Sequence, residues 1–292
     1  MSLLTPAYMV AVWLGLRLVV RPEQVAIFWP ASGVALGVLL LVPTRRWPSL
    51  LAAWFVVHAG SELAVGLHIL PALAYPAIAL AEVTLGASLI RRTTRHESLA
   101  DLDRRGLFAL TGWMTLVAAP LSAVAAAAIH QQILGGDFIR VTVLWWSAEV
   151  VGELVVAPAL LTASSLAKWW ARAGLARRIE GVTELVVVVL VGIATFAIPA
   201  EYGPLALAAL ALPGPVLAIL GWRVGPGAVA LATLLLSGVT VWFSGQHRGP
   251  FSLFEPDVVS QVLIIQAYLM IVIGPALLLA LVEREAADSS TQ

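Results

Sequence analysis

The chain has 292 residues, of which 60% are hydrophobic and 12% charged, and its formal net charge is +0. A mean hydropathy of +0.94 lies far above that of a soluble domain and indicates an integral membrane protein. The neutral charge gives no basic field to attract nucleic acid, so nucleic acid is not expected as a partner. The absence of cysteine excludes disulfides and thiolate metal sites.

Hydrophobic segments follow one another along the chain, and a spanning helix needs about 20 residues. Ten such segments are Leu4–Val20, Val25–Val42, Trp47–Ile69, Pro71–Ile90, Gly106–Ile129, Thr142–Leu166, Val182–Pro199, Pro204–Trp222, Gly225–Phe243 and Val258–Val282. The first two are short or interrupted by proline, so either could be re-entrant or tilted. The sequence predicts an all-α polytopic transmembrane bundle of eight to ten spans. Residues 1–282 form the expected membrane domain, and residues 283–292 a short polar tail, expected to be disordered.

Basic residues distribute unequally between the connecting loops when ten spans start from a cytoplasmic N-terminus. The outer loops hold three: Arg21, Arg140 and Arg248. The inner loops hold thirteen: Arg45, Arg46, Arg91, Arg92, Arg95, Arg104, Arg105, Lys168, Arg172, Arg177, Arg178, Arg223 and Arg284. This positive-inside bias predicts that both termini are cytoplasmic in a multi-pass protein of the plasma membrane.

The sixth segment, VLWWSAEVVGELVVAPALL, carries two carboxylates within an apolar stretch. Glu149 and Glu153 are four residues apart and share one face of a helix. Gly152 lies between them and permits close approach of another helix, and Pro158 removes a backbone donor in the next turn. Because a carboxylate is costly among acyl chains, both are expected to face the protein interior, with one of them protonated.

Other polar residues also fall inside the apolar segments. His58 and Glu62 are four apart and share a face of the third segment, and they are the expected partners of the sixth. Glu82 lies in the middle of the fourth segment, where a Trp or Thr of a neighbouring helix could bind it. Arg17, near the end of the first, either snorkels to the surface or pairs with a glutamate. The open functional alternatives are a polar ligand pocket, a proton relay and a metal site.

Specific chemistry is less well supported. A metal site would use His58, Glu62, Glu149 and Glu153, but their spacing matches no metal motif, so no metal is expected. The chain contains no GxSxG, no HExxH and no phosphate-binding glycine loop. We therefore expect neither catalytic activity nor a cofactor, and a membrane-embedded enzyme using the His/Glu cluster is the weakest alternative.

Several motifs resemble those of the first membrane-associated sensor (MASE) domain family. The second segment reads FWPASG and is followed by RRWP, which is similar to the opening signature of that family. Glu82 followed by basic residues resembles the glutamate-bearing helix of the family. WWSAEVVGELVVAP resembles its Trp–x–x–acid–x–x–Gly–x–x–x–x–x–Pro helix. The opening and sixth-segment positions are Trp29, Pro30, Ser32, Gly33, Arg45, Arg46, Trp47, Pro48, Glu149, Gly152 and Pro158.

The resemblance implies a sensory input domain of bacterial signalling proteins, in the inner membrane. Such domains usually precede a histidine kinase, a diguanylate cyclase or a phosphodiesterase. Only nine residues follow Glu283, too few for an output module. The chain is then a stand-alone member, or its output half lies on another chain or was removed. The expected partners are a histidine kinase or a cyclic-dinucleotide output protein and a second copy of the chain. The runner-up function is a small-solute or ion transporter that uses the intramembrane glutamates. Candidate pocket residues are Arg17, Trp29, Pro30, His58, Glu62, Glu82, Glu149, Gly152 and Glu153.

Overall fold

The computed structural model describes residues 4–20, 25–95, 98–100, 102–246, 248–253 and 258–290, which are mostly helical. Each of the ten predicted segments coincides with helical structure, so the all-α prediction is confirmed. Seven helical stretches of the described chain are long and apolar enough to cross a membrane: Ile69–Thr94, Arg104–Ile133, Phe138–Arg172, Leu175–Ala197, Ala200–Arg223, Pro226–Gly245 and Val259–Ala286. The first three segments are not among these seven, so a count of eight to ten spans stays a prediction.

The chain forms two compact units. Unit 1 comprises residues 1–100 and 105–161, and unit 2 comprises residues 101–104 and 162–292. Helix α7 (Phe138–Arg172) continues from the first unit into the second. The expected membrane domain over 1–282 therefore contains two packed bodies, which are described separately below.

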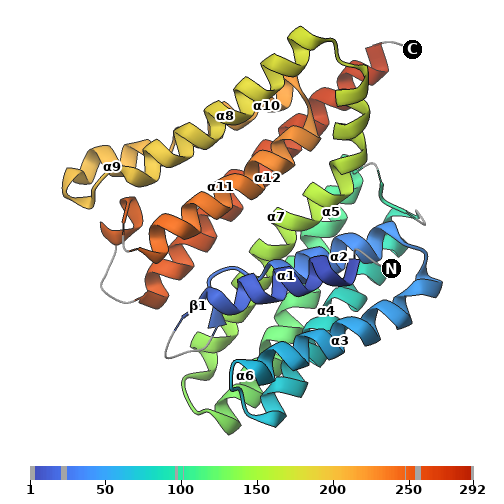
Figure 1. Cartoon of the computed structure of the whole chain (residues 1–292), viewed down its shortest axis with the longest axis vertical. Helices are drawn as coiled ribbons and strands as arrows, with labels where there is room; N and C mark the ends of the chain where they lie inside the picture. The colour runs from blue at the N-terminus through green and yellow to red at the C-terminus, as the bar shows by residue number, and fades with distance from the viewer. Residues whose placement is uncertain are drawn as a thin grey trace. The chain divides into compact units, whose positions relative to one another are not determined.

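Unit 1 is built around the short helix α2. Its elements are α1 (Leu4–Arg17), β1 (Val19–Val20), β2 (Val25–Ala26), α2 (Pro30–Leu41), η1 (Thr44–Arg46), α3 (Trp47–Ala64), α4 (Ile69–Thr94), α5 (Arg104–Trp113), η2 (Met114–Ala118), α6 (Ala119–Ile133) and the first part of α7. Ten of the twelve residues of α2 are buried, and α1 and α4 pack against it (Figure 1). Because α2 is apolar on all sides, it can occupy the centre of a bundle.

The first two predicted helices are shorter than expected. The predictions extended over Leu4–Val20 and Val25–Val42, but β1 and β2 form a two-residue antiparallel pair between α1 and α2. The β-branched valines of this pair favour extended backbone, which hydropathy alone does not detect. Helix α2 begins at Pro30, whose fixed φ and missing N–H suit the first helical position.

A π-helical turn, η2, interrupts the fifth segment between α5 and α6. Pro120 follows it in the first turn of α6 and has no N–H for an intrahelical hydrogen bond. Within η2, the Thr115 carbonyl accepts a hydrogen bond of 2.9 Å from Trp146 Nε1 of α7. The irregular turn therefore offers a carbonyl that joins α7 to this stretch.

Unit 2 is a second helical bundle. Its elements are the end of α7, α8 (Leu175–Ala197), η3 (Ala200–Tyr202), α9 (Gly203–Ala209), α10 (Pro213–Arg223), α11 (Pro226–Gly245), η4 (Pro250–Leu253) and α12 (Val258–Ser290). Helix α11 packs against α8 and α12, and α10 packs against α12. Phe196, Phe251 and Tyr268 form an aromatic cluster with ring centroids 5.4 to 6.0 Å apart. Such spacing is typical of aromatic pairs in a packed core.

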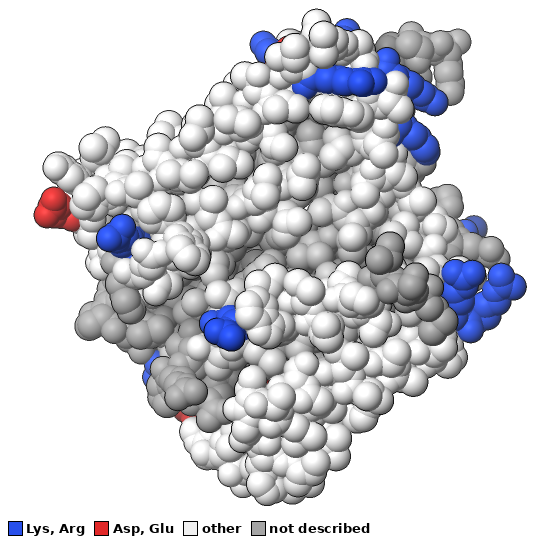
Figure 2. Space-filling model, viewed as in Figure 1, with Lys and Arg blue, Asp and Glu red and all other residues white. Residues whose placement is uncertain are grey.

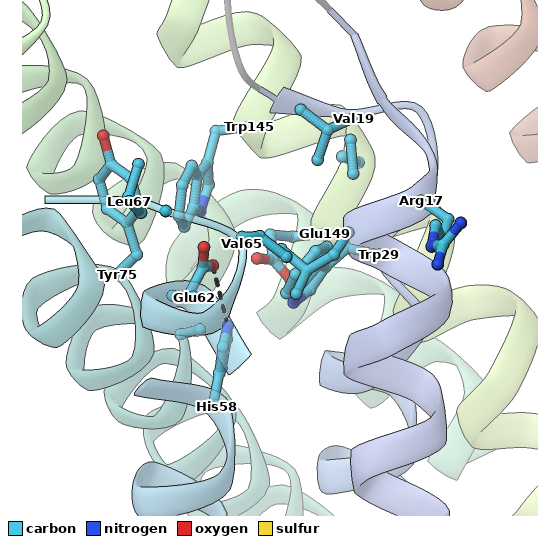
Figure 3. A pocket seen from close by; sticks show the side chains of 15 residues that line it. Arg17, Val19, Trp29, His58, Glu62, Val65, Leu67, Tyr75, Trp145 and Glu149 are labelled. Atoms are coloured by element: carbon cyan, nitrogen blue, oxygen red, sulfur yellow. Dashed lines mark ion pairs between the residues drawn. The ribbon is translucent and has the colours of Figure 1, made fainter. Parts of the chain in front are cut away.

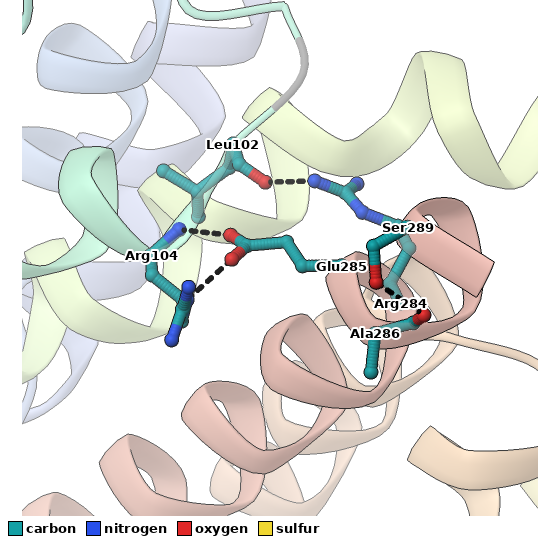
Figure 4. Close-up of polar contacts among 6 residues, drawn as sticks. All are labelled: Leu102, Arg104, Arg284, Glu285, Ala286 and Ser289. Atoms are coloured by element: carbon teal, nitrogen blue, oxygen red, sulfur yellow. Dashed lines mark hydrogen bonds and ion pairs between the residues drawn. The ribbon is translucent and has the colours of Figure 1, made fainter. Parts of the chain in front are cut away.

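The described part of the tail is helical as far as Ser290, contrary to the prediction of disorder. Its last turns bind Leu102 and Arg104, the first residue of α5 (Figure 4). Arg284 Nη2 donates a 2.7 Å hydrogen bond to the Leu102 carbonyl. Glu285 accepts a 3.1 Å bond from the Arg104 backbone and forms an ion pair with its guanidinium. The composition of the tail alone does not predict these contacts, because they join it to residues far away in the sequence.

The exposed surface is apolar along the helices. In the face shown in Figure 2, Lys and Arg gather at helix ends, whereas the flanks of the helices are largely uncharged. Large exposed apolar side chains include Val56, Leu116, Leu121, Leu190 and Ile271. A soluble protein rarely exposes such a surface, whereas a membrane protein covers it with lipid.

Candidate functional site

A cavity of about 730 Å³ opens at one end of unit 1 (Figure 3). Helices α1, α3, α4 and α7 contribute to its wall, together with the strand pair and the loop between α3 and α4. Its polar and aromatic lining consists of Arg17, Trp29, His58, Glu62, Tyr75, Trp145 and Glu149. The volume falls within the range of about 300 to 1,000 Å³ that is usual for small-molecule sites.

His58 and Glu62 lie on one face of α3, as their spacing predicts. His58 Nε2 is 3.4 Å from Glu62 Oε1, and His58 Nδ1 is 3.1 Å from the Tyr8 hydroxyl. The Trp29 ring centroid lies 5.3 Å from that of His58, and Tyr8 stacks on Trp54 at 5.0 Å. The imidazole is therefore fixed by contacts at both nitrogens and at its face.

Helix α7 presents Trp145 and Glu149 to the same cavity, one turn apart. Glu149 is only 2% exposed, and its Oε2 has no hydrogen-bond partner among the described residues. The buried Trp145 Nε1 also lacks a partner within the described part of the chain. Tyr75 packs its ring 5.2 Å from that of Trp145 and bonds His130 Nδ1 at 3.1 Å. Glu149 Oε2 is thus an acceptor, and Trp145 Nε1 a donor, that a ligand in the cavity could bind.

The backbone of α7 touches the start of α2 at Gly152. A Cβ added to Gly152 would collide with the Trp29 carbonyl, and a Cβ added to Gly33 would collide with the Gly152 carbonyl. The Trp29 N–H donates a 3.4 Å hydrogen bond to the Ala148 carbonyl. Ser32 of α2 hydrogen-bonds the Glu149 carboxyl. The positive end of the α2 dipole, which begins at Pro30, therefore faces the acidic part of α7.

Two further carboxyls are buried in unit 1. Glu82 is 3% exposed and accepts a hydrogen bond from Ser122 of α6, whereas Glu153 is fully buried. The carboxyls of Glu82 and Glu153 interact with each other, and no hydroxyl, amide or basic group of the described residues donates to Glu153. Such a contact becomes a hydrogen bond only when one carboxyl carries a proton. All three glutamates of the prediction face the interior of the unit.

Arg17 does not pair with a glutamate in the described structure. Its guanidinium lies 4.9 Å above the Trp13 ring, and Figure 3 shows it directed away from Glu62 and Glu149. Arg17 is exposed at the mouth of the cavity, which favours the surface alternative. No group of three or more His, Asp or Glu residues in the described chain is placed to hold a metal ion.

Several residues in and around the site were not predicted. The expected partner of Glu82 was a Trp or Thr, but the residue that binds it is Ser122. Trp145 was not among the candidate pocket residues, yet it lines the cavity. Its spacing of four residues before Glu149 was an available signal. Tyr8 and Tyr75 come from separate helices, so no local pattern connects them with the site.

These features define a multi-pass helical membrane protein with a polar cavity and buried carboxyls. The family model MASE1 matches residues 1–286, nearly the whole chain. The chain therefore belongs to the MASE1 family of integral membrane sensory domains of signalling proteins. Neither the curated proteins nor the solved structures include a match.

Proposed function

We propose that this chain is the ligand-binding input part of a bacterial signalling system, with the cavity of unit 1 as the site of stimulus recognition. The observation that carries this proposal is Glu149. It is a buried carboxyl in the cavity wall with one oxygen lacking a partner among the described residues. An unsatisfied buried acceptor costs free energy, which a ligand donor recovers on binding.

The position of Glu149 on α7 supports a route for the signal. Gly152, one turn along the same helix, touches the Trp29 backbone directly. Because backbone-to-backbone contact leaves no compressible side chain, a shift of α7 at Glu149 must also move the start of α2. Helix α7 continues into unit 2, so the same shift has a covalent path out of the cavity. The recipient is a histidine kinase or a cyclic-dinucleotide output protein.

A cavity-filling substitution tests the proposal. Ala148→Leu places a larger side chain in the wall, whereas Ala52→Leu changes an exposed residue of α3. Each variant is fused to a histidine kinase output module, and phosphorylation is measured across growth media. We expect Ala148→Leu to abolish the variation shown by the unmodified fusion, while Ala52→Leu retains it. A correctly inserted Ala148→Leu fusion that varies normally would contradict the proposal.

The Glu82–Glu153 pair favours a second candidate, a proton-coupled transporter. These two carboxyls and Glu149 interact electrostatically within unit 1 and provide acidic groups for proton transfer. In proteoliposomes with an acidic exterior, a proton-coupled transporter would acidify the lumen, and Glu153→Gln would prevent this acidification. If the chain is only a sensor, neither the unmodified protein nor the Glu153→Gln variant acidifies the lumen.

A further inference from the structure

We propose that the cavity of unit 1 binds an organic cation, a small molecule with an ammonium group and a nearby hydrogen-bond acceptor. The inference rests on the proposed function only in taking this cavity as the sensory site. It assigns the chemical class of ligand from the charge, the aromatic lining and the size of the cavity.

The charge of the lining favours a cation. Glu62 and Glu149 both reach the cavity and are 7% and 2% exposed. His58 is already bound by Tyr8 and Glu62. Arg17 is the one Lys or Arg among the lining residues of the described structure, and its guanidinium stacks on Trp13. An anionic ligand would therefore meet two carboxyls, whereas an ammonium group gains two acceptors.

Aromatic rings complete a site of this kind. Trp29, Tyr75 and Trp145 line the cavity from three different parts of unit 1. Aromatic faces attract alkylated ammonium groups, and the attraction is largest where water is excluded. Trp145 Nε1 lacks an acceptor among the described residues, so a hydroxyl or carbonyl on the ligand would satisfy it.

The same lining disfavours a bare metal ion. Nowhere in the described chain do three or more His, Asp or Glu residues form a group suited to a metal. A volume of about 730 Å³ also exceeds what one ion requires, whereas it suits a small organic molecule. An organic cation, in contrast, can use both the carboxyls and the aromatic rings of the lining.

Thermal-shift measurements on the full chain in lipid nanodiscs test this assignment. The probes are choline and ethanolamine, and the neutral control is 3,3-dimethylbutan-1-ol, which has the shape of choline without its charge. We expect at least one ammonium probe to raise the melting temperature in a concentration-dependent way, and the neutral alcohol to have no such effect. Equal stabilisation by the alcohol, or no stabilisation by any ammonium probe, would overturn the proposal.

Variants locate the binding. Glu149→Gln keeps the shape of the side chain and should weaken binding about tenfold to hundredfold, because the cation then faces a neutral amide in place of a carboxyl group that can be negatively charged. Trp145→Leu should weaken it about threefold to thirtyfold through loss of the cation–π contact. Glu201→Gln alters an exposed glutamate of η3 and should change nothing. Unchanged affinity in both cavity variants, with both still folded, would place the cation elsewhere and refute the proposal. If no cation binds but Ala148→Leu still abolishes signalling, the sensory function stands and only this ligand class fails.

Discussion

Buried polar residues in unit 1 divide into those bound within the protein and those with atoms left over. Ser122 satisfies one oxygen of Glu82, while Tyr8 and Glu62 hold His58. Glu82 Oε1 and Glu149 Oε2 each lack a hydrogen-bond partner among the described residues, and of these two carboxyls only Glu149 lines the cavity. Because an unpaired buried group costs more than a paired one contributes, the unpaired oxygen that lies in the cavity wall is where a ligand donor would gain most.

The Ser122 hydroxyl should be important for stability. In Ser122→Ala, Glu82 loses its donor, so we expect the free energy of unfolding to fall by about 1 to 3 kcal/mol. The matched control is Ser88→Ala, because the Ser88 hydroxyl bonds only a carbonyl of its own helix, Thr84. Unfolding in mixed micelles measures both changes. Equal losses in the two variants would show that the bond to Glu82 adds no net stability.

The sequence identified the acidic site residues but not their partners. Charged residues in apolar segments are rare and costly, so Glu82, Glu149 and Glu153 were recognisable singly. Serine and tyrosine are common in such helices, so Ser122, Tyr8 and Tyr75 carried no comparable signal. Their roles depend on which helices meet, and hydropathy contains no information on that. For the same reason, the sequence predicted Glu153 only as the neighbour of Glu149 on one helix face, whereas in the structure Glu153 also interacts with Glu82 on another helix.

At the scale of elements, α2 shows how a short helix is held inside unit 1. Its twelve residues rise about 18 Å, less than the roughly 30 Å of a bilayer core, so it cannot span alone. Its last carbonyls are satisfied by side chains, since Arg91 Nη2 donates to Leu39 at 2.7 Å and to Val42 at 2.6 Å. Trp47 Nε1 also donates to the Leu39 carbonyl at 3.1 Å. Hydropathy located this segment correctly but gave no sign that Arg91 and Trp47 cap its C-terminal carbonyls.

Removing this cap should destabilise unit 1. Arg91→Ala deletes the charge-assisted bonds to the carbonyls of Leu39, Leu40 and Val42, and a stacking contact with Trp47, whose ring centroid is 5.1 Å from the guanidinium carbon. We expect a loss of about 2 to 4 kcal/mol in unfolding free energy. Arg92→Ala, at the exposed neighbouring position, is the control and should remain within about 0.5 kcal/mol. A similar small effect for both would mean that water satisfies the α2 carbonyls equally well.

The contact between α2 and α7 leads to a prediction for glycine. Gly152→Ala forces the two backbones apart and should cost about 1 to 3 kcal/mol, as overpacking does in cores. Gly60→Ala is the matched control, because a Cβ there meets no atom within 4 Å and α3 gains helix propensity. Thermal unfolding should therefore show a lower melting temperature for Gly152→Ala alone. If Gly152→Ala melts like Gly60→Ala, the close approach has no energetic importance.

At the scale of the whole molecule, the apolar segments of the sequence predicted the positions of the helices more reliably than the residues at which the helices begin and end. Helices α7 and α12 continue past Leu166 and Val282, because polar residues also form helix once neighbouring contacts hold them. In the tail, these contacts come from Leu102 and Arg104. The strand pair after Arg17 was missed because hydropathy does not distinguish apolar valines in a strand from apolar residues in a helix.

The orientation of the chain in the membrane is the last prediction, and it decides from which side a ligand enters. The loop between α3 and α4 includes Val65, which is 64% exposed and lines the cavity mouth. The positive-inside bias places this loop outside and the segment containing Ser98, together with the tail, inside. Because the chain has no cysteine, single substitutions give unambiguous labelling sites. A membrane-impermeant maleimide should label Val65→Cys in intact spheroplasts, and Ser98→Cys and Ser289→Cys only in inverted vesicles. Labelling of all three from the same side, or the reversed pattern, would contradict the orientation and with it an external route to the cavity.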